Sequence, residues 1–423
     1  MTAPQSTARA DAAATSFSPW RAVVGFGVVS LAADMVYEGA RSVTGPLLAS
    51  LGASAVLVGL VTGAAEAAAL VLRLVFGPFA DRSGRYWSLT LTGYGLTAVC
   101  VPLLAVTPFL GAAGLTVACV LLLAERTGKA VRSPSKSALL AQAAGQVGMG
   151  RGLGVHKALD QVGAFAGPLL VAALVAVTGA IWPAMLALAI PGAAAIALLV
   201  WLQRRIPAAD DKSTPPEAET NLAATSGLRM VLRAGVGAGL PRVFFRFAWS
   251  AGAATAGLVT FGVISYHLTT DKLLPVAGVP VVYAAAMAVA ALAALATGFS
   301  YDRLGARVLY LLPVLVTAVP ALAFSQSVAL AVTGVLVWGA AVGLQDSTVK
   351  ALVADLVPRP QRATAYGVFA AIQGGAAVLG GGAAGYLYTR SVPLLVAVVA
   401  ATQAVALVLL VLTLRGRATA DAA

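Results

Sequence analysis

Two short segments decide how this chain folds: Gly77-Pro-Phe-Ala-Asp81-Arg82-Ser-Gly84-Arg85 and Gly298-Phe-Ser-Tyr-Asp302-Arg303-Leu-Gly305-Ala-Arg307. Both have the pattern Gly-x-x-x-Asp-Arg-x-Gly, and Asp302 follows Asp81 by 221 residues. Each segment comes directly after a long apolar run, so its charged residues lie where a hydrophobic helix is predicted to end. The chain therefore contains a unit that is repeated once, about half a chain length later.

The composition around these segments excludes a soluble protein. Of 423 residues, 60% are hydrophobic and only 10% are charged, and the mean hydropathy is +0.90. Soluble domains have about 25% charged residues. The formal net charge of +12 would indicate nucleic acid in a soluble protein. In a membrane protein such charge is interpreted by its position relative to the bilayer, so we expect no nucleic-acid partner.

The apolar runs predict an all-α membrane protein with twelve transmembrane helices, arranged as two pseudo-symmetric six-helix bundles. A span needs about 20 mostly apolar residues. The predicted spans are residues 20–49, 54–80, 87–108, 112–143, 152–178, 180–204, 242–267, 276–300, 306–325, 328–356, 363–388 and 392–414.

These spans divide the chain into five parts: a disordered tail over 1–19, an N-terminal bundle over 20–204, a linker over 205–241, a C-terminal bundle over 242–414 and a tail over 415–423. Nearly all basic loop residues fall on one side, whereas the other side carries only Lys272 and Arg390. Because basic loops stay in the cytoplasm, we expect a multi-pass protein of the bacterial cytoplasmic (inner) membrane with both termini inside.

Three features of the sequence indicate a family: the two loops, Arg126 followed by Gly128, and the segment Gly163-x-x-x-Gly167-Pro168. With these features, the chain resembles the major facilitator superfamily over its whole length. It is most similar to a bacterial branch for which we know no settled substrate. The resemblance implies transport by alternating access of the two bundles. Internal repeats are typical of secondary transporters, whose binding site lies between the repeats.

The resemblance also implies roles for individual residues. The loops would act as gates, in which a loop carboxylate pairs with a nearby arginine and Gly77 lets helices approach closely; the gating candidates are Gly77, Asp81, Arg82, Arg85, Asp302 and Arg303. Arg126 matches an arginine that assists proton transfer in many relatives. The helix-packing candidates Gly163, Gly167 and Pro168 resemble an antiporter motif, although Leu169 and Leu170 stand where that motif has two glycines.

Charged residues also lie inside the predicted spans. Asp34, Tyr37, Glu38 and Arg41 share one helical face. An unpaired basic residue costs roughly 2.5–3.5 kcal/mol at the centre of a membrane helix, so such groups face the bundle interior. Three interpretations remain open: internal ion pairs, arginines that bind an anionic solute, and carboxylates that carry protons.

The candidates for each role follow from this distribution. The proton-coupling candidates are Asp34, Glu38, Glu66 and Asp160. The substrate-binding candidates are Tyr37, Arg41, Arg126, Lys129, Arg132, His156 and Gln161 in the first half and Trp338, Gln345 and Asp346 in the second.

The sequence therefore predicts a secondary active transporter of a small organic solute, coupled to protons and moving the solute outward by antiport. The alternative is proton-coupled uptake of an anionic metabolite; from other classes, a channel or a non-transporting membrane sensor remains. We expect a monomer in the lipid bilayer that is not an enzyme and has no cofactor or metal, since metal-ligand and hydrolase motifs are missing from the sequence.

Overall fold

The structure is a computed structural model that describes residues 17–206, 240–358 and 361–421. Within these ranges it contains helices and no strands, and twelve helical segments are long and apolar enough to cross a membrane. This confirms the predicted fold class. Most of the predicted tail 1–19 and of the linker 205–241 lies outside the described residues, whereas the last helix continues past 414 to Asp421.

The first half contains the first six spans, several of which are interrupted. Its helices are α1 (Pro19–Ser42), α2 (Thr44–Ser50), α3 (Ala55–Val71), α4 (Arg73–Ser83), α5 (Tyr86–Leu103), the 3₁₀ turns η2 (Leu104–Phe109) and η3 (Gly111–Ala113), α6 (Gly114–Gly145), α7 (Met149–Thr178), α8 (Ile181–Ala187) and α9 (Ala189–Arg205).

The second half repeats this arrangement. Its helices are α11 (Arg242–Gly257), α12 (Phe261–Thr270), α13 (Gly278–Leu304), the 3₁₀ turn η4 (Gly305–Tyr310), α14 (Leu311–Ala323), α15 (Val328–Leu356), α16 (Arg362–Arg390) and α17 (Val392–Asp421).

One predicted span, 242–267, is broken in its middle. Helix α11 ends at Gly257, Leu258 adopts an extended conformation with ψ 94°, and α12 starts at Phe261. The break releases backbone carbonyl groups that a continuous helix would use. Such discontinuous helices are tolerated in membranes where they are buried in protein or line a cavity. Here the indole Nε1 of Trp338 donates to the Val259 carbonyl over 2.9 Å.

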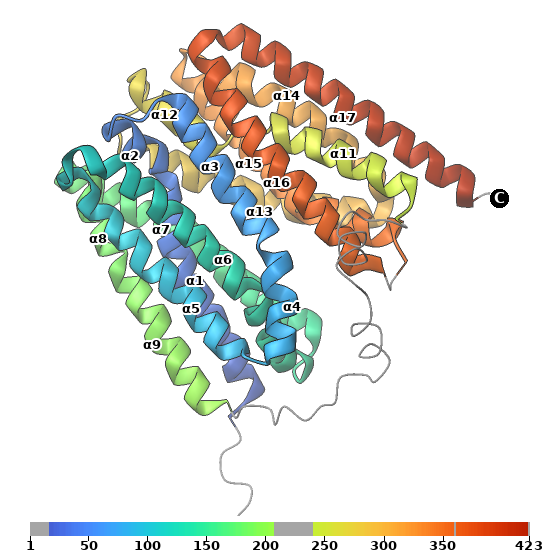
Figure 1. Cartoon of the computed structure of the whole chain (residues 1–423), viewed down its shortest axis with the longest axis horizontal. Helices are drawn as coiled ribbons and strands as arrows, with labels where there is room; N and C mark the ends of the chain where they lie inside the picture. Colours follow the sequence, from blue (N-terminus) through green and yellow to red (C-terminus); the bar gives the residue numbers. More distant parts are fainter. Residues whose placement is uncertain (1–16, 207–239, 359–360, 422–423) are drawn as a thin grey trace, which may run out of the picture.

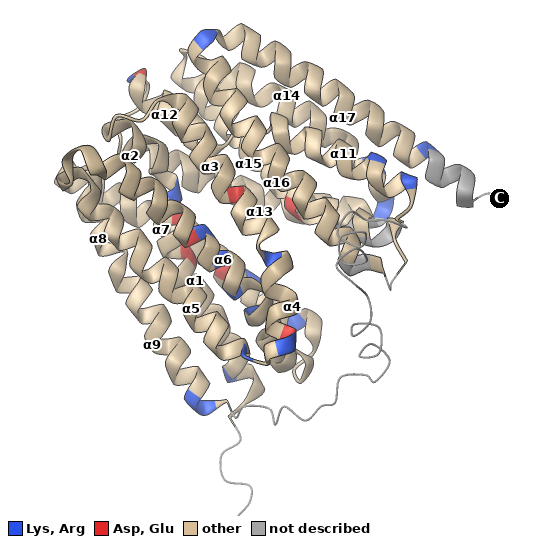
Figure 2. Ribbon diagram, in the orientation of Figure 1, with Lys and Arg blue, Asp and Glu red and all other residues tan. Residues whose placement is uncertain are grey.

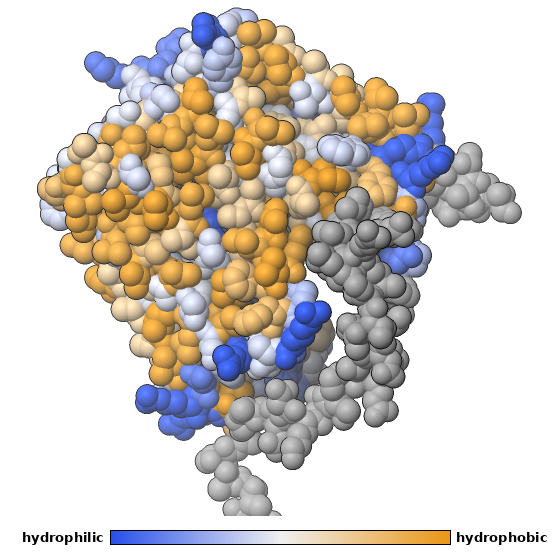
Figure 3. All heavy atoms as spheres, viewed as in Figure 1, coloured by the Kyte–Doolittle hydropathy of each residue, from blue (hydrophilic) through white to orange (hydrophobic). Residues whose placement is uncertain are grey.

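The distribution of apolar and charged side chains is the one expected for a protein that spans a bilayer. Apolar side chains cover the flanks of the molecule in Figure 3, and hydrophilic ones lie toward its ends. Charged residues inside the fold gather in the first half, among α1, α6 and α7, whereas most of the second half is uncharged along its spans (Figure 2). The membrane-embedded chemistry is therefore concentrated in one of the two bundles.

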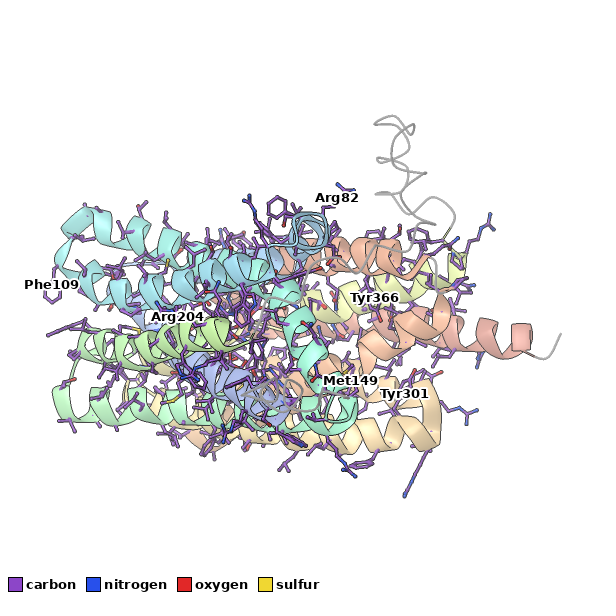
Figure 4. All side chains as sticks on the ribbon, turned by 90° about the horizontal axis from the view of Figure 1, so that it is seen from below. Arg82, Phe109, Met149, Arg204, Tyr301 and Tyr366 are labelled. Carbon is purple, nitrogen blue, oxygen red and sulfur yellow. The ribbon has the colours of Figure 1, made fainter. Side chains whose placement is uncertain are left out.

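The two halves meet at one end and separate toward the other. We call the end at which Pro19, Arg205 and Arg242 lie the termini end, and the opposite end the far end. In Figure 1 the blue-to-green and yellow-to-red bundles lie together near α2 and α12 and diverge toward the end of α9. Figure 4 labels residues from both ends of the molecule. Phe109 lies at the far end, whereas Arg82 and Tyr301 lie near the termini end.

Glycines make the closure at the far end possible. A Cβ atom on Gly59 of α3 would lie 2.0 Å from the carbonyl oxygen of Gly381 in α16, and one on Gly45 would lie 2.2 Å from that of Gly262. Small residues of this kind let membrane helices approach closely. The close approach expected at Gly77 is not found, because no atom lies within 4 Å of a Cβ placed there. Gly77 is near the termini end, where the halves are apart.

Within the first half, α7 lies against α1 at two glycines. A Cβ on Gly163 would be 2.2 Å from the Leu31 carbonyl oxygen, and one on Gly167 would be 2.3 Å from that of Met35. Pro168 follows inside the same helix and is buried. These residues set the distance between the two helices that carry Asp34, Glu38 and Asp160.

We expect Gly163→Ala to lower the thermal stability of the purified protein in detergent. The added methyl group collides with backbone rather than with a flexible side chain, and overpacking of this kind typically costs about 1–3 kcal/mol. The matched control is Gly154→Ala in the same helix, where no atom lies within 4 Å of the added Cβ. Equal melting temperatures for the two variants would contradict the proposed contact.

Candidate functional site: a charged cavity between the halves

Two adjoining cavities lie between the halves, below the closed far end. Their volumes are about 180 and 40 Å³, and both are lined by Arg41, Glu66 and Thr260. The larger cavity extends toward the termini end as far as Leu70 and Val349. Because residues of both halves line it, it is the candidate binding site.

An ion-pair network forms the first-half wall of this site. Glu66 of α3 accepts a hydrogen bond of 2.7 Å from Arg41 of α1 and one of 3.2 Å from Arg126 of α6, both at its Oε1 atom. Arg126 also lies 3.7 Å from Glu125. The side chains of Arg126 and Glu125 are 9% and 6% exposed, whereas that of Glu66 is 31% exposed. Glu66 is thus the more exposed of the two carboxylates in this network, and it lines both cavities.

Tyr37 binds the cations of this network together. Arg126 and Arg41 both donate to its hydroxyl oxygen. The Arg126 guanidinium and the Lys129 ammonium lie 4.3 and 3.8 Å from the centre of its ring. A cation over an aromatic ring gains about 0.5–2 kcal/mol when desolvated. Tyr37 therefore offsets part of the cost of burying three cations side by side.

The arrangement has a chemical consequence. Two guanidinium groups share the Glu66 carboxylate, so a second anion could replace Glu66 on either of them, and a proton on Glu66 would weaken both bonds. Arginine binds carboxylate and phosphate groups through two parallel hydrogen bonds. Arg41 and Arg126 can consequently release the Glu66 carboxylate and bind the anionic group of a solute in its place.

The two carboxylates of α1, Asp34 and Glu38, line neither cavity. Glu38 accepts a hydrogen bond from Tyr283 of α13, in the opposite half. Asp34 lies close enough to Asp160 of α7 to interact with it directly. Asp160 also accepts a 2.6 Å bond from Lys157. The helical face that Asp34, Tyr37, Glu38 and Arg41 share is therefore divided between a cavity wall and two helix interfaces.

Several substrate-binding candidates fall outside the cavities. Arg132 is buried, donates to Thr97, and lies 4.6 Å from the ring of Tyr94. His156 is buried and lies 3.3 Å from the ammonium of Lys136. These groups hold helices of the first half together, as do the ion pairs.

Lys129 and Gln161 likewise line neither cavity, although Lys129 stays near the site through the ring of Tyr37. The basic residues of α6 recur at helical spacing on one face, and this face continues past the cavity into the interior of the first bundle.

The second-half wall is polar and mostly uncharged. Trp338, Gln345 and Asp346, predicted from sequence, all line the larger cavity. Gln345 and Gln373 donate to the hydroxyl of Thr255 over 3.1 and 3.3 Å. The Oε1 atom of Gln345 is buried, with no hydrogen-bond partner among the described residues.

Sequence reasoning missed Thr255, Gln373 and Thr260. Thr260 shares a 2.8 Å hydrogen bond with Thr62 across the halves. In the sequence, only the polar character of these residues within apolar spans could have indicated a place at the site. This indication is weak, because threonine and glutamine also occur as internal hydrogen-bond partners in membrane helices.

The loop residues are disengaged in this conformation. Asp81 is exposed and accepts a 3.1 Å hydrogen bond from Tyr86. Arg82, Arg85 and Arg303 are exposed, and the side chain of Arg82 projects away from the bundle in Figure 4. The side chain of Asp302 lies outside the described part of the chain. The separation of the halves at the termini end explains why, among the described residues, no arginine pairs with Asp81 as the resemblance implies.

Twelve spans in two halves around a shared cavity define a multi-pass membrane protein with a transporter fold. The family model described as Major Facilitator Superfamily matches residues 26–289 and 267–422. The chain belongs to the major facilitator superfamily. It is 52% identical over 403 residues to uncharacterized proteins of Mycobacterium tuberculosis and Mycobacterium bovis, and these alignments cover 95% of this chain and 95% of each relative.

Solved structures share the fold at low sequence identity. The nucleoside transporter NupG has a TM-score of 0.62 at 16% identity and covers 93% of this chain and 98% of its own. A peptide transporter, POT, in complex with sulfate has a TM-score of 0.70 at 13% identity, with 93% and 94% covered. A bacterial homologue of Spinster, described as inward-facing and unoccupied, has a TM-score of 0.64 at 15% identity, with 94% and 96% covered.

We predict that Arg126→Ala destabilises the protein by about 3 kcal/mol, because breaking a buried pair leaves an uncompensated charge. Here that charge is Glu125. The double variant Arg126→Ala/Glu125→Gln should recover part of the loss, since it removes both charges. Arg204→Ala, at an exposed position, serves as the control. Thermal unfolding in detergent measures all three, and a double variant less stable than the single one would refute the assignment.

Proposed function

We propose that this protein is a secondary active transporter that works by alternating access. The observation that carries the proposal is the cavity between the halves, whose one wall bears Arg41, Glu66 and Arg126 and whose other wall bears Gln345, Gln373 and Thr255. With the termini in the cytoplasm, as the basic loops favour, the conformation described here is closed to the outside and open inward.

The proposed coupling ion is the proton. Glu66 is a carboxylate within reach of the cavity, and its charge holds two arginines. A proton on Glu66 would free Arg41 and Arg126 and change the charge of the cavity wall by one unit. Proton binding and solute binding would thus compete for, or depend on, the same two guanidinium groups.

The proposed solute is a small organic anion that also carries amide or hydroxyl groups. The anionic group suits Arg41 and Arg126. The neutral polar part suits the hydrogen-bonding side chains of Gln345, Gln373 and Thr255, and Trp338 and Phe369 offer apolar contact. The lining also carries Glu125 and Asp346, so the preference for an anion rests on the paired hydrogen bonds that an arginine can donate and not on a surplus of basic groups.

For direction, we propose outward movement in exchange for protons. Its support is the likeness of the Gly163–Pro168 segment to an antiporter motif. Uptake of an anionic metabolite together with protons is the second candidate, and the placement of Glu66 between the two arginines at the cavity favours it. A solute anion that displaces Glu66 from the arginines leaves this carboxylate in a poor solvent for charge, where it would take up a proton.

The first experiment is a thermal-shift screen of the purified protein against organic anions, zwitterions, cations and lipophilic drugs, at an acidic and a neutral pH. A ligand at 100 times its Kd should stabilise the protein by about 2.7 kcal/mol. We expect anions with amide or hydroxyl groups to stabilise the wild type but not an Arg41→Ala variant. Stabilisation by cations alone would overturn the proposed solute class.

Glu66→Gln should uncouple transport from the pH gradient. In proteoliposomes loaded with a solute found by the screen, we expect the variant to carry the solute down its own gradient but to lose the stimulation by an imposed pH difference. Asp271→Asn, at the far end and outside both cavities, is the control and should behave like the wild type. Gradient-driven accumulation by Glu66→Gln at the wild-type level would exclude Glu66 as the proton carrier.

A further inference from the structure

Helix α1 contacts two different surroundings within one turn. Tyr37 and Arg41 line the cavity, whereas Glu38 does not and instead faces α13 of the other half. There Tyr283 donates a hydrogen bond to the Oε2 atom of Glu38. Glu38 is thus placed at the contact between the halves, separate from the cavity wall that holds Glu66.

The hydroxyl group of Tyr283 is held in a fixed position. Its side chain is fully buried, and its ring centre lies 4.5 Å from that of Phe261 and 6.1 Å from that of Trp338. Trp338 is itself anchored to the broken segment between α11 and α12 through the Val259 carbonyl. A tyrosine fixed in this way cannot follow Glu38 if the two halves move relative to each other, so the bond depends on how they are placed.

This bond is a titratable connection between the halves. The Thr62–Thr260 bond also crosses them, but both of its partners are neutral hydroxyl groups. The charged and titratable groups that interact with Glu38 are Asp34, Tyr37 and Arg41 on α1, Lys129 on α6 and Tyr283 on α13.

We propose that Tyr283 is a positioning residue that couples the protonation state of Glu38 to the arrangement of the two halves. Ionised Glu38 accepts a charge-assisted hydrogen bond from Tyr283 and holds the far end closed. Protonation of Glu38 weakens this bond, because charge-assisted hydrogen bonds are roughly twice as strong as neutral ones, and the equilibrium shifts toward a conformation in which the far end opens. The inference rests on the proposed proton coupling and adds a second carboxyl group that responds to conformation rather than to solute.

The test measures the distance across the far end without any solute or gradient. Spin labels at Ala112→Cys and Ser327→Cys, both exposed far-end positions in opposite halves, report the opening in a background in which Cys100 and Cys119 are replaced by serine. For the otherwise wild-type protein we expect the ratio of open to closed molecules to rise about tenfold from the high-pH to the low-pH plateau. The sign follows from the carboxylate, which is charged at high pH and neutral at low pH.

Two variants identify the groups responsible. Tyr283→Phe should remove the pH-dependent change and give an open fraction near the wild-type value at low pH. Glu38→Gln should give the same result independently. The control is Tyr94→Phe, which also removes one hydroxyl from a buried tyrosine, but one whose partner, Ser30, lies in the same half. It should retain the wild-type pH response.

The proposal is overturned if Tyr283→Phe or Glu38→Gln titrates like the wild type, or if the wild type shows no pH-dependent opening. These results are distinct from a failure of the proposed function. A far end that opens on protonation in a protein that carries no solute would support the Tyr283–Glu38 coupling and refute transport. Proton-coupled transport by a protein whose far end does not respond to pH would support the proposed function and refute the Tyr283–Glu38 coupling.

Discussion

The pairing of Glu66 with Arg41 and Arg126 is the constraint on which the other features of the site depend. Each ion would be costly in hydrocarbon, and partners or a water-filled cavity reduce that cost. Three helices of the first half, α1, α3 and α6, must therefore converge at one point. Their convergence positions Tyr37 among the cations and places Glu66 at the wall of both cavities.

Glycines determine what these charges are next to. At the far end, α3 and α16 approach so closely that Gly59 and Gly381 contact each other through their backbones. This contact closes one end of the cavity and brings the second-half wall, with Gln345 and Gln373, opposite the arginines. The same kind of contact at Gly163 and Gly167 brings α7 to α1. Close approach of helices thus converts separate charged residues into a two-walled site.

The broken span between α11 and α12 adds a second kind of constraint. Its released carbonyl at Val259 orients Trp338, which packs with Phe261 and Tyr283. This aromatic group fixes the hydroxyl that binds Glu38 in the other half. A local interruption of backbone hydrogen bonding in one bundle therefore determines the surroundings of a carboxylate in the other.

The sequence was sufficient for the twelve spans and the repeated halves, since hydrophobic length and the two Gly-x-x-x-Asp-Arg-x-Gly segments depend only on local order along the chain. Helical periodicity also placed Tyr37 and Arg41 on the same face of α1 as Glu38. Only the tertiary structure separated them, with Tyr37 and Arg41 at the cavity and Glu38 against Tyr283. It likewise removed Arg132 and His156 from the cavity and added Thr255 and Gln373. The reason is that periodicity defines the face of a helix, whereas the neighbour of that face depends on how closely distant helices pack.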